Sequence, residues 1–313
     1  MTLTIFVLIV SLAAIVYGAN TFVDGATDLA RKYNVSDYVI GAVIVGIGTS
    51  FPELTVSVIG AIEGNSDVAI GNVVGSNIFN ILGILGITAL LFPITVSKVN
   101  MMIDIPLCLF VTVLLTLLTF NSVTGDTQHL GLIDGIVLLL LFVLFIYVSL
   151  KTNNGADVVS GPGLRIIPLW IIIIKLVLGL AVLVAGSRFF VDYAIIFARI
   201  IGVNDAFISV TLIAYGTSLP ELAASITAAL KKNTQMALGN IIGSNIFNIT
   251  LILGVGSIIR PLSSSDIDLY YYLIMISTVL LVLFTGFKGK MTRVGGALIF
   301  LCFILYNIFV LNG

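Results

Sequence analysis

Long apolar stretches separated by short polar segments run along almost the whole chain. Ten of these stretches have about the 20 residues that a helix needs to cross a bilayer. They cover residues 3–19, 38–62, 67–92, 101–120, 130–150, 166–187, 206–230, 235–259, 269–287 and 294–311. The pattern predicts an all-α polytopic membrane protein with ten transmembrane helices.

Two polar motifs interrupt the apolar pattern, and both occur twice. GTSFPEL at Gly48–Leu54 and GNVVGSNIFNI at Gly71–Ile81 return as GTSLPEL at Gly216–Leu222 and GNIIGSNIFNI at Gly239–Ile249. The offset is 168 residues throughout, and 19 of the 34 residues from Gly48 to Ile81 are identical in the second copy. A duplicated fold needs only a matching apolar pattern, so identity of the polar residues indicates that both copies contribute to one polar site.

The repeating unit contains five of the predicted spans, which is an odd number. The second copy must therefore enter the membrane from the opposite side, as in the inverted repeats of many transporters. We expect a first five-helix repeat at 1–150 with its motif block at 46–81, and a second at 165–313 with its motif block at 214–249. The polar residues 151–164 have the composition of a linker.

Composition supports the membrane class, and the basic residues orient the chain. The chain is 59% apolar and 9% charged, with a mean hydropathy of +1.22, whereas soluble domains carry about 25% charged residues. With the N-terminus outside, the inner loops hold ten basic residues, against three outside: Arg188, Arg199 and Arg260. The inner ones are Arg31, Lys32, Lys98, Lys151, Arg165, Lys231, Lys232, Lys288, Lys290 and Arg293. The bias predicts a multi-pass plasma-membrane protein with a cytoplasmic linker and both termini extracellular.

Two of the 15 acidic residues stand apart from the others. Thirteen are expected in loops or at span ends: Asp24, Asp28, Asp37, Glu63, Asp67, Asp104, Asp126, Asp134, Asp157, Asp192, Asp205, Asp266 and Asp268. Glu53 and Glu221 instead lie inside the second and seventh spans, at equivalent repeat positions. An ionised Asp or Lys at a helix centre costs about 2.5–3.5 kcal/mol, and neither glutamate has a basic residue nearby in its span. A bound cation would supply the missing charge, the alternative being protonated glutamic acids hydrogen-bonded between helices.

The residues around each glutamate favour a hard cation. Pro52 removes a backbone donor and disturbs the preceding helical turn, so we expect the carbonyls from Gly46 to Thr49 to be freed near the membrane centre. Such carbonyls are tolerated there only beside a cavity or an ion. With Ser and Thr hydroxyls and a carboxylate they form an all-oxygen set, which suits Ca²⁺ and not the softer metals that bind Cys or His. The second copy offers Ala214, Thr217, Ser218, Pro220 and Glu221.

The second motif supplies amides and hydroxyls. We expect Ser76, Asn80, Ser244 and Asn248 to be site residues, with Asn72 and Asn240 as supports. Ser76 and Asn80 are four residues apart and share a helix face. The Gly-x-x-x-Gly spacings within the motif favour close approach of helices.

The paired G-T-S-x-P-E and G-N-x-x-G-S-N-x-x-N blocks resemble the repeats of the sodium/calcium exchangers, within the cation/Ca²⁺ antiporter superfamily. The chain is similar over almost its whole length to the compact prokaryotic and archaeal members. The resemblance implies electrogenic exchange of about three Na⁺ for one Ca²⁺, by alternating access as the first and sixth helices slide past a rigid core. It implies ion ligands at Gly46, Thr49, Ser50, Glu53, Ser76, Asn80, Ala214, Thr217, Ser218, Glu221, Ser244 and Asn248. Gly46 and Ala214 contribute backbone carbonyls, and the two Glu with the Thr carbonyls chiefly hold Ca²⁺.

One departure bears on the transported ions. Some archaeal relatives and the K⁺-dependent branch have Asp where this chain has Asn248. The site therefore carries two formal negative charges instead of three, which weakens the case for K⁺ co-transport. The GTSxPE motif also differs from the glutamate-bearing motif of the proton-coupled Ca²⁺ branch.

Other functional classes remain as alternatives at this point. A Ca²⁺/H⁺ antiporter is the runner-up, because a desolvated glutamate can also titrate. A cation channel is less favoured, because an inverted repeat inside one chain does not build a pore on a rotational axis between subunits. An intramembrane hydrolase lacks a nucleophile–base pair or a His/Cys metal cluster in the spans. We therefore expect no enzymatic activity and no cofactor. The expected partners are Na⁺ and Ca²⁺ as substrates and the lipid bilayer, with no nucleic acid and no obligatory protein partner.

Overall fold

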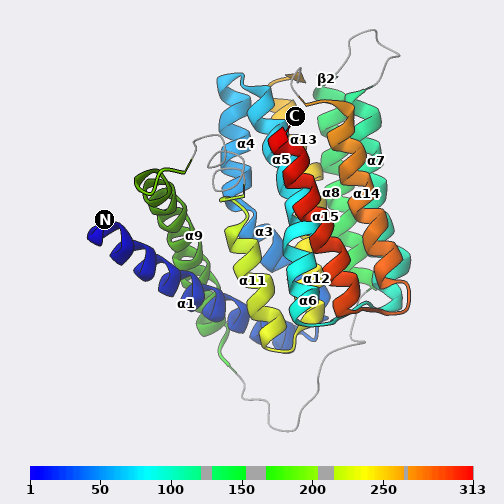
Figure 1. The fold of residues 1–313 in the computed structure, drawn as a ribbon. Coiled ribbons are helices and arrows are strands. Elements are labelled where there is room, and N and C mark those ends of the chain that lie inside the picture. Colours follow the sequence, from blue (N-terminus) through cyan, green and yellow to red (C-terminus); the bar gives the residue numbers. More distant parts are fainter. Residues whose placement is uncertain (121–128, 153–166, 204–214, 264–266, 313) are drawn as a thin grey trace.

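The first half of the chain forms a series of helices, several of them broken by π-helical turns (Figure 1). The computed structural model describes residues 1–120, 129–152, 167–203, 215–263 and 267–312. The elements of this half are α1 (Thr2–Tyr33), α2 (Asp37–Val39), η1 (Ile40–Val45), α3 (Gly46–Thr49), α4 (Phe51–Glu63), α5 (Ser66–Ile78), η2 (Phe79–Leu85), α6 (Gly86–Leu91), β1 (Ile94–Thr95), η3 (Asn100–Asp104), α7 (Ile105–Thr119), β2 (His129–Leu130) and α8 (Leu132–Thr152).

The second half is also mainly helical in its described residues. Its described elements are α9 (Leu169–Ile200), α11 (Leu219–Leu230), α12 (Thr234–Phe247), η5 (Asn248–Ile252), α13 (Leu253–Ile259), β3 (Leu262–Ser263), α14 (Leu269–Gly286), β4 (Lys290–Met291) and α15 (Arg293–Asn312). The linker expected at 151–164 lies outside the described residues from position 153 onwards.

Within the described residues, eight helices are long and apolar enough to cross a membrane. A ninth span is added if the pair Asp37–Thr49 and Phe51–Glu63, bent by 48°, counts as one. Of the seventh expected span, 206–230, residues 206–214 lie outside the described residues, and the rest contains the short apolar helix Leu219–Leu230. The helical membrane class is confirmed, and the arrangement as ten helices stays a prediction.

The sequence places the end of the first helix wrongly. It predicts a span over 3–19 with Asp24 and Asp28 beyond it, but α1 continues to Tyr33 and contains both carboxylates. Each is paired: Asp28 Oδ2 lies 2.7 Å from Lys175 Nζ of α9, and Asp24 Oδ1 lies 2.7 Å from Lys231 Nζ. The pairing allows charged side chains to sit within a long helix. The sixth span is also longer than expected, because α9 runs to Ile200 and includes Asp192.

Asp104 lies near a span end, as expected, but its side chain is buried. It lies four residues inside the helix Asn100–Thr119. Its Oδ2 accepts a hydrogen bond from Asn100 Nδ2 at 3.0 Å. A buried carboxylate therefore exists outside the repeated motifs, where neighbouring polar groups make burial possible.

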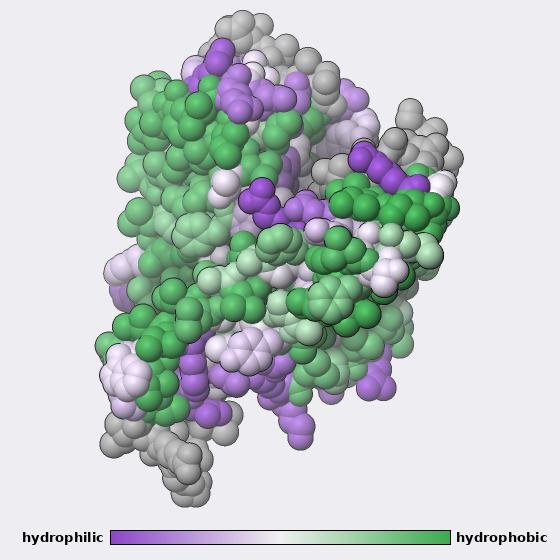
Figure 2. All heavy atoms as spheres, turned by 90° about the vertical axis from the view of Figure 1, so that its left-hand side faces the viewer, coloured by the Kyte–Doolittle hydropathy of each residue, from purple (hydrophilic) through white to green (hydrophobic). Residues whose placement is uncertain are grey.

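The helices separate into a pair and a larger bundle. Figure 1 shows α1 and α9 crossing one another at the side of the other helices, and they pack along each other. Much of the face that they form is hydrophobic, with hydrophilic residues gathered towards its upper and lower edges (Figure 2). Such a face suits contact with lipid.

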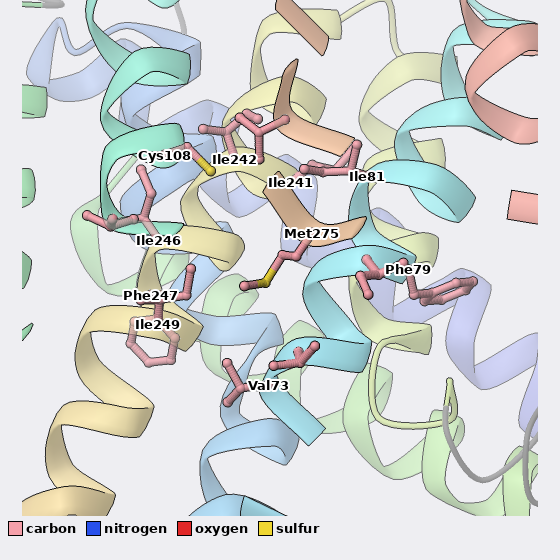
Figure 3. Packing of buried hydrophobic residues seen from close by; sticks show 14 of the residues in the cluster. Val73, Phe79, Ile81, Cys108, Ile241, Ile242, Ile246, Phe247, Ile249 and Met275 are labelled. Carbon is pink, nitrogen blue, oxygen red and sulfur yellow. The ribbon is translucent and has the colours of Figure 1, made fainter. Parts of the chain in front are cut away.

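The core of the bundle lies where the two halves meet. Figure 3 shows apolar side chains of α5 and η2 packed against those of α12, α7 and α14. Val73, Ile81, Ile241, Ile246 and Ile249 are all fully buried in this cluster. The motif-bearing helices are therefore held by packing from both repeats.

Two short antiparallel ribbons also join the halves. Ile94 of β1 pairs with Met291 of β4, and Leu130 of β2 pairs with Leu262 of β3. Each ribbon takes one strand from each half of the chain. The connections at the helix ends are thus tied across the two repeats.

Candidate functional site

A break in the helix lies within the first copy of the GTSxPE motif, and the second copy has the same backbone angles at the equivalent serine. Between α3 and α4 the axis bends by 48° at Ser50, whose φ and ψ are −83° and 10°. Ser218 has almost the same angles, −90° and 9°, just before α11. Pro52 and Pro220 lie in the first turn of the following helix, where a missing backbone N–H costs little. Ser50 and Ser218 therefore each stand directly before a helix whose first turn carries a proline and a buried glutamate.

The two glutamates are joined to the opposite repeat by serine hydroxyls. Ser50 Oγ donates to Glu221 Oε1 at 2.8 Å, and Ser218 Oγ donates to Glu53 Oε1 at 2.8 Å. All four side chains are fully buried. The two bonds are equivalent, because Ser50 and Ser218 are 168 residues apart and so are Glu53 and Glu221. The two motif copies therefore meet at one place. This meeting is what the repeated polar residues predict.

Asn72 supports the backbone that carries Glu53. Its Nδ2 donates to the Glu53 carbonyl at 3.1 Å and to Ser57 Oγ at 2.9 Å. On its other side, Thr217 Oγ1 donates to Asn72 Oδ1 at 3.5 Å. The amide group therefore connects α5 to α4 and to the opposite repeat.

Asn240 makes the equivalent contacts in the second repeat. Its Nδ2 donates to the Glu221 carbonyl at 3.2 Å and to Ser225 Oγ at 2.8 Å. Thr49 Oγ1 donates to Asn240 Oδ1 at 3.2 Å. Thr49 and Thr217 thus lie beside the supporting asparagines of the other repeat.

The Gly46 carbonyl is not freed as the sequence predicts. Its oxygen accepts a helical hydrogen bond from the Ser50 N–H at 3.1 Å. Pro52 removes the donor for the carbonyl four residues back, which is Gly48, so the bond to Gly46 survives. Ser244 Oγ also donates to the Gly46 carbonyl, at 3.3 Å, which brings these two candidate residues together. The equivalent carbonyl, Ala214, lies outside the described residues.

Four asparagines are hydrogen-bonded across the repeat boundary: Asn77 and Asn245 close a ring through each other's carbonyls, and Asn80 and Asn248 each bond to one member of this ring. Asn77 Nδ2 donates to the Asn245 carbonyl at 3.1 Å, and Asn245 Nδ2 donates to the Asn77 carbonyl at 3.2 Å. Asn80 Nδ2 donates to Asn245 Oδ1 at 3.0 Å, and Asn248 Nδ2 donates to Asn77 Oδ1 at 3.0 Å. Each of these bonds has an equivalent in the other repeat, because Asn77 and Asn245 are 168 residues apart and so are Asn80 and Asn248.

Five buried oxygens of the candidate residues have no hydrogen-bond partner in the described parts of the chain. They are Glu53 Oε2, Glu221 Oε2, Ser76 Oγ, Asn80 Oδ1 and Asn248 Oδ1. Burying such groups without a partner is unfavourable. Neither glutamate makes an ion pair within the described residues. The arrangement is therefore a set of oxygen donors that includes two carboxyl groups, suited to a hard cation.

The site contains four supporting residues that the sequence analysis did not select. Ser57 and Ser225 accept bonds from the supporting asparagines, and Asn77 and Asn245 form the ring. A signal was present, because both pairs are separated by 168 residues and are identical. Ser57 and Ser225 also lie four residues after the glutamates, on the same helix face.

Comparison with known proteins identifies similar chains. Residues 3–151 and 171–312 match the family profile described as "Sodium/calcium exchanger protein". The chain is 40% identical over 317 residues to CaxA of Alkalimonas amylolytica, with 97% of each chain covered. It is 33% identical over 327 residues to the sodium/calcium exchanger MaX1 of Methanosarcina acetivorans, covering 92% of this chain and 93% of MaX1.

A solved structure also resembles the fold. The sodium-calcium exchanger NCX_Mj, soaked with 10 mM Na⁺ and zero Ca²⁺, aligns with a TM-score of 0.84 and 32% sequence identity. The alignment covers 97% of this chain and 97% of that one. The likeness therefore extends over both repeats.

Proposed function

The chain belongs to the sodium/calcium exchanger family, and we propose that it is a secondary antiporter that exchanges Na⁺ for Ca²⁺ at the buried site. The names of MaX1 and NCX_Mj support this substrate pair. The proposed stoichiometry is about three Na⁺ for one Ca²⁺, by alternating access.

The observation that carries the proposal is the set of unpartnered oxygens contributed by both repeats. Two of the five belong to Glu53 and Glu221, whose charges balance one Ca²⁺. Ca²⁺ takes six to eight oxygen ligands, so the five oxygens leave room for hydroxyls, carbonyls or water. A bound cation offsets the unfavourable burial of two carboxylates at one site.

We assign the ion ligands to the same twelve residues that the sequence predicts. They are Gly46, Thr49, Ser50, Glu53, Ser76, Asn80, Ala214, Thr217, Ser218, Glu221, Ser244 and Asn248. The glutamates would chiefly bind Ca²⁺, with the Asn80 and Asn248 oxygens completing that set, and the hydroxyl and amide positions would also help to build the Na⁺ sites. Hydrogen bonds across the repeats support the assignment for six of them: Gly46, Ser50, Glu53, Ser218, Glu221 and Ser244.

The proposed architecture is two inverted repeats of five helices, at 1–150 and 165–313, joined by a cytoplasmic linker at 151–164. Reciprocal contacts related by the 168-residue offset support it, because a pseudo-twofold axis would generate such pairs. The site would lie near the membrane midplane, on that axis.

We expect the purified protein in liposomes to accumulate ⁴⁵Ca²⁺ when Na⁺ is loaded inside and removed outside. Replacing internal Na⁺ with choline should stop the uptake. An imposed pH gradient without Na⁺ should not support it. Uptake driven by pH alone would instead indicate a Ca²⁺/H⁺ antiporter, and flux that neither saturates nor needs a counter-ion would indicate a channel.

Voltage should drive the exchange as well as the Na⁺ gradient. Three Na⁺ leaving for one Ca²⁺ entering moves one net positive charge outward, and one charge is worth about 2.3 kcal/mol per 100 mV. An interior-positive potential should therefore accelerate Na⁺-driven Ca²⁺ uptake, and an interior-negative potential, set with K⁺ and valinomycin, should slow it. Uptake that is indifferent to the clamped voltage would favour an electroneutral two-for-one cycle.

The proposed orientation can be tested by thiol labelling in intact cells. In a background lacking Cys108 and Cys302, a cysteine at Lys288 should be protected from an impermeant reagent added outside. A cysteine at Glu63 should be labelled, because the positive-inside bias places the end of α4 outside. Both positions are exposed, so the reverse labelling pattern would overturn the orientation.

A further inference from the structure

The ring formed by Asn77 and Asn245 determines which way the amide groups of Asn80 and Asn248 face. A backbone carbonyl can only accept a hydrogen bond. Asn77 and Asn245 each face a carbonyl of the opposite repeat, so each must present its Nδ2 there. Their Oδ1 atoms are then fixed on the other side of the amide plane.

The orientation of Asn77 and Asn245 in turn determines that of Asn80 and Asn248. Because Asn245 presents Oδ1, Asn80 must present Nδ2 to it, and its own Oδ1 turns the other way. Asn248 is oriented by Asn77 in the same manner. The two Oδ1 atoms that result are buried and have no partner among the described residues. They belong to the same unpartnered set as Glu53 Oε2 and Glu221 Oε2.

Apolar side chains surround the four asparagines and shield them from solvent. Asn77, Asn80, Asn245 and Asn248 are all almost fully buried. Figure 3 shows Ile246, Phe247 and Ile249, the neighbours of this ring on α12 and η5, packed in the apolar cluster. Hydrogen bonds in such an environment are strong, and leaving one unmade is costly. Rotation of the Asn80 or Asn248 amide would break its hydrogen bond to Asn245 or Asn77.

We propose that Asn77 and Asn245 are positioning residues, which hold the carbonyl oxygens of Asn248 and Asn80 towards the bound cation. This inference rests on the proposed function. A rotated amide would present N–H groups to the cation instead of an oxygen. The ring therefore fixes the amides of Asn80 and Asn248 so that each presents its oxygen as a ligand. In each case the orienting residue comes from the opposite repeat.

The test uses the difference between an amide and a carboxylate. A carboxylate has oxygen on both sides, so a rotated Asp still presents an oxygen. Asn245→Ala removes the acceptor for Asn80 Nδ2 and should weaken Ca²⁺ binding by roughly 10- to 100-fold, as is typical when a residue that orients a metal ligand is lost. In the Asn80→Asp background the same Asn245→Ala change should weaken binding far less. The Ca²⁺ dissociation constant is measured on purified protein without Na⁺.

The wild type, Asn245→Ala, Asn80→Asp and the double variant form a double-mutant cycle. This cycle separates a positioning role of Asn245 from a purely structural one. Equal losses of Ca²⁺ affinity from Asn245→Ala in both backgrounds would show that Asn245 serves only to join the helices. No loss in either background would also overturn the inference. The cycle with Asn77→Ala and Asn248→Asp repeats the comparison through the other repeat, and replaces the first if Asn245→Ala does not fold.

The outcome is distinguishable from failure of the proposed function. Absence of Na⁺-driven Ca²⁺ uptake by the wild-type protein would count against exchange, whereas the cycle is read from Ca²⁺ binding alone. A wild-type protein that exchanges ions but shows no coupling between positions 245 and 80 would reject only the positioning role.

Discussion

Glu53→Gln is expected to abolish Ca²⁺ exchange while leaving the protein folded. The change removes half of the formal negative charge of the site, and the affinity of such sites for Ca²⁺ depends on the charge count. The glutamine Oε1 can still accept the Ser218 hydrogen bond seen at Glu53 Oε1. Removing a buried charge also removes a cost of about 2.5–3.5 kcal/mol, on the scale measured for ionised side chains at a helix centre.

The measurement is Na⁺-driven ⁴⁵Ca²⁺ uptake in liposomes, with size-exclusion elution and thermal unfolding as checks of folding. Glu221→Gln should behave in the same way, because Ser50 bonds it as Ser218 bonds Glu53. Glu63→Gln is the matched control, since Glu63 is exposed at the end of the same helix α4 and should retain exchange. A well-folded Glu53→Gln protein with wild-type flux would refute the site assignment.

Gly243→Ala is expected to destabilise the protein and to impair the site. A Cβ atom at position 243 would lie 2.5 Å from the Cα and the carbonyl oxygen of Ala42. Both are backbone atoms, so α12 and η1 would have to separate. Overpacking of this kind costs about 1–3 kcal/mol. The separation would also disturb the neighbouring contact between Ser244 Oγ and the Gly46 carbonyl.

The same substitution at Gly256 provides the control within the same long helix. A Cβ there would meet only the side chains of Leu262, at 3.2 Å, and Ala61, at 3.8 Å. The Leu262 methyl group would have to shift by a few tenths of an ångström, while Ala exceeds Gly in helix propensity by up to about 1 kcal/mol, so Gly256→Ala should cost far less stability than Gly243→Ala. Thermal unfolding in detergent and Ca²⁺ affinity compare the two variants. Equal stability of both would show that α12 and η1 can separate without loss.

The membrane class and the family were predictable because both depend on local or repeated sequence. Apolar stretches of sufficient length indicate spans whatever the packing, and the paired motifs are specific. The meeting of Ser50 with Glu221 was expected only in outline, since the repeated polar motifs predicted one shared site without naming its contacts. The positions of ligand atoms were not predictable from motif spacing.

The sequence-based predictions were wrong about the end of the first helix and about the Gly46 carbonyl. Asp24 and Asp28 suggested that the first helix ends early, because charged residues usually mark a span boundary. Their partners Lys231 and Lys175 lie far away in sequence, so the pairing that permits the longer α1 became visible only in three dimensions. The Gly46 carbonyl likewise retains the Ser50 N–H as its partner, a detail of one helical turn that the proline alone did not indicate.

Residue identity was therefore sufficient for the membrane class and for the two buried glutamates, because composition, span length and the 168-residue offset can be read along the chain. Tertiary contacts were needed to orient the ligand atoms. Asn80 has the same amide whichever way it faces, and only the Asn245 side chain from the other repeat selects the orientation. That choice is made across the repeat boundary, because the acceptor and the amide that it orients lie 165 residues apart.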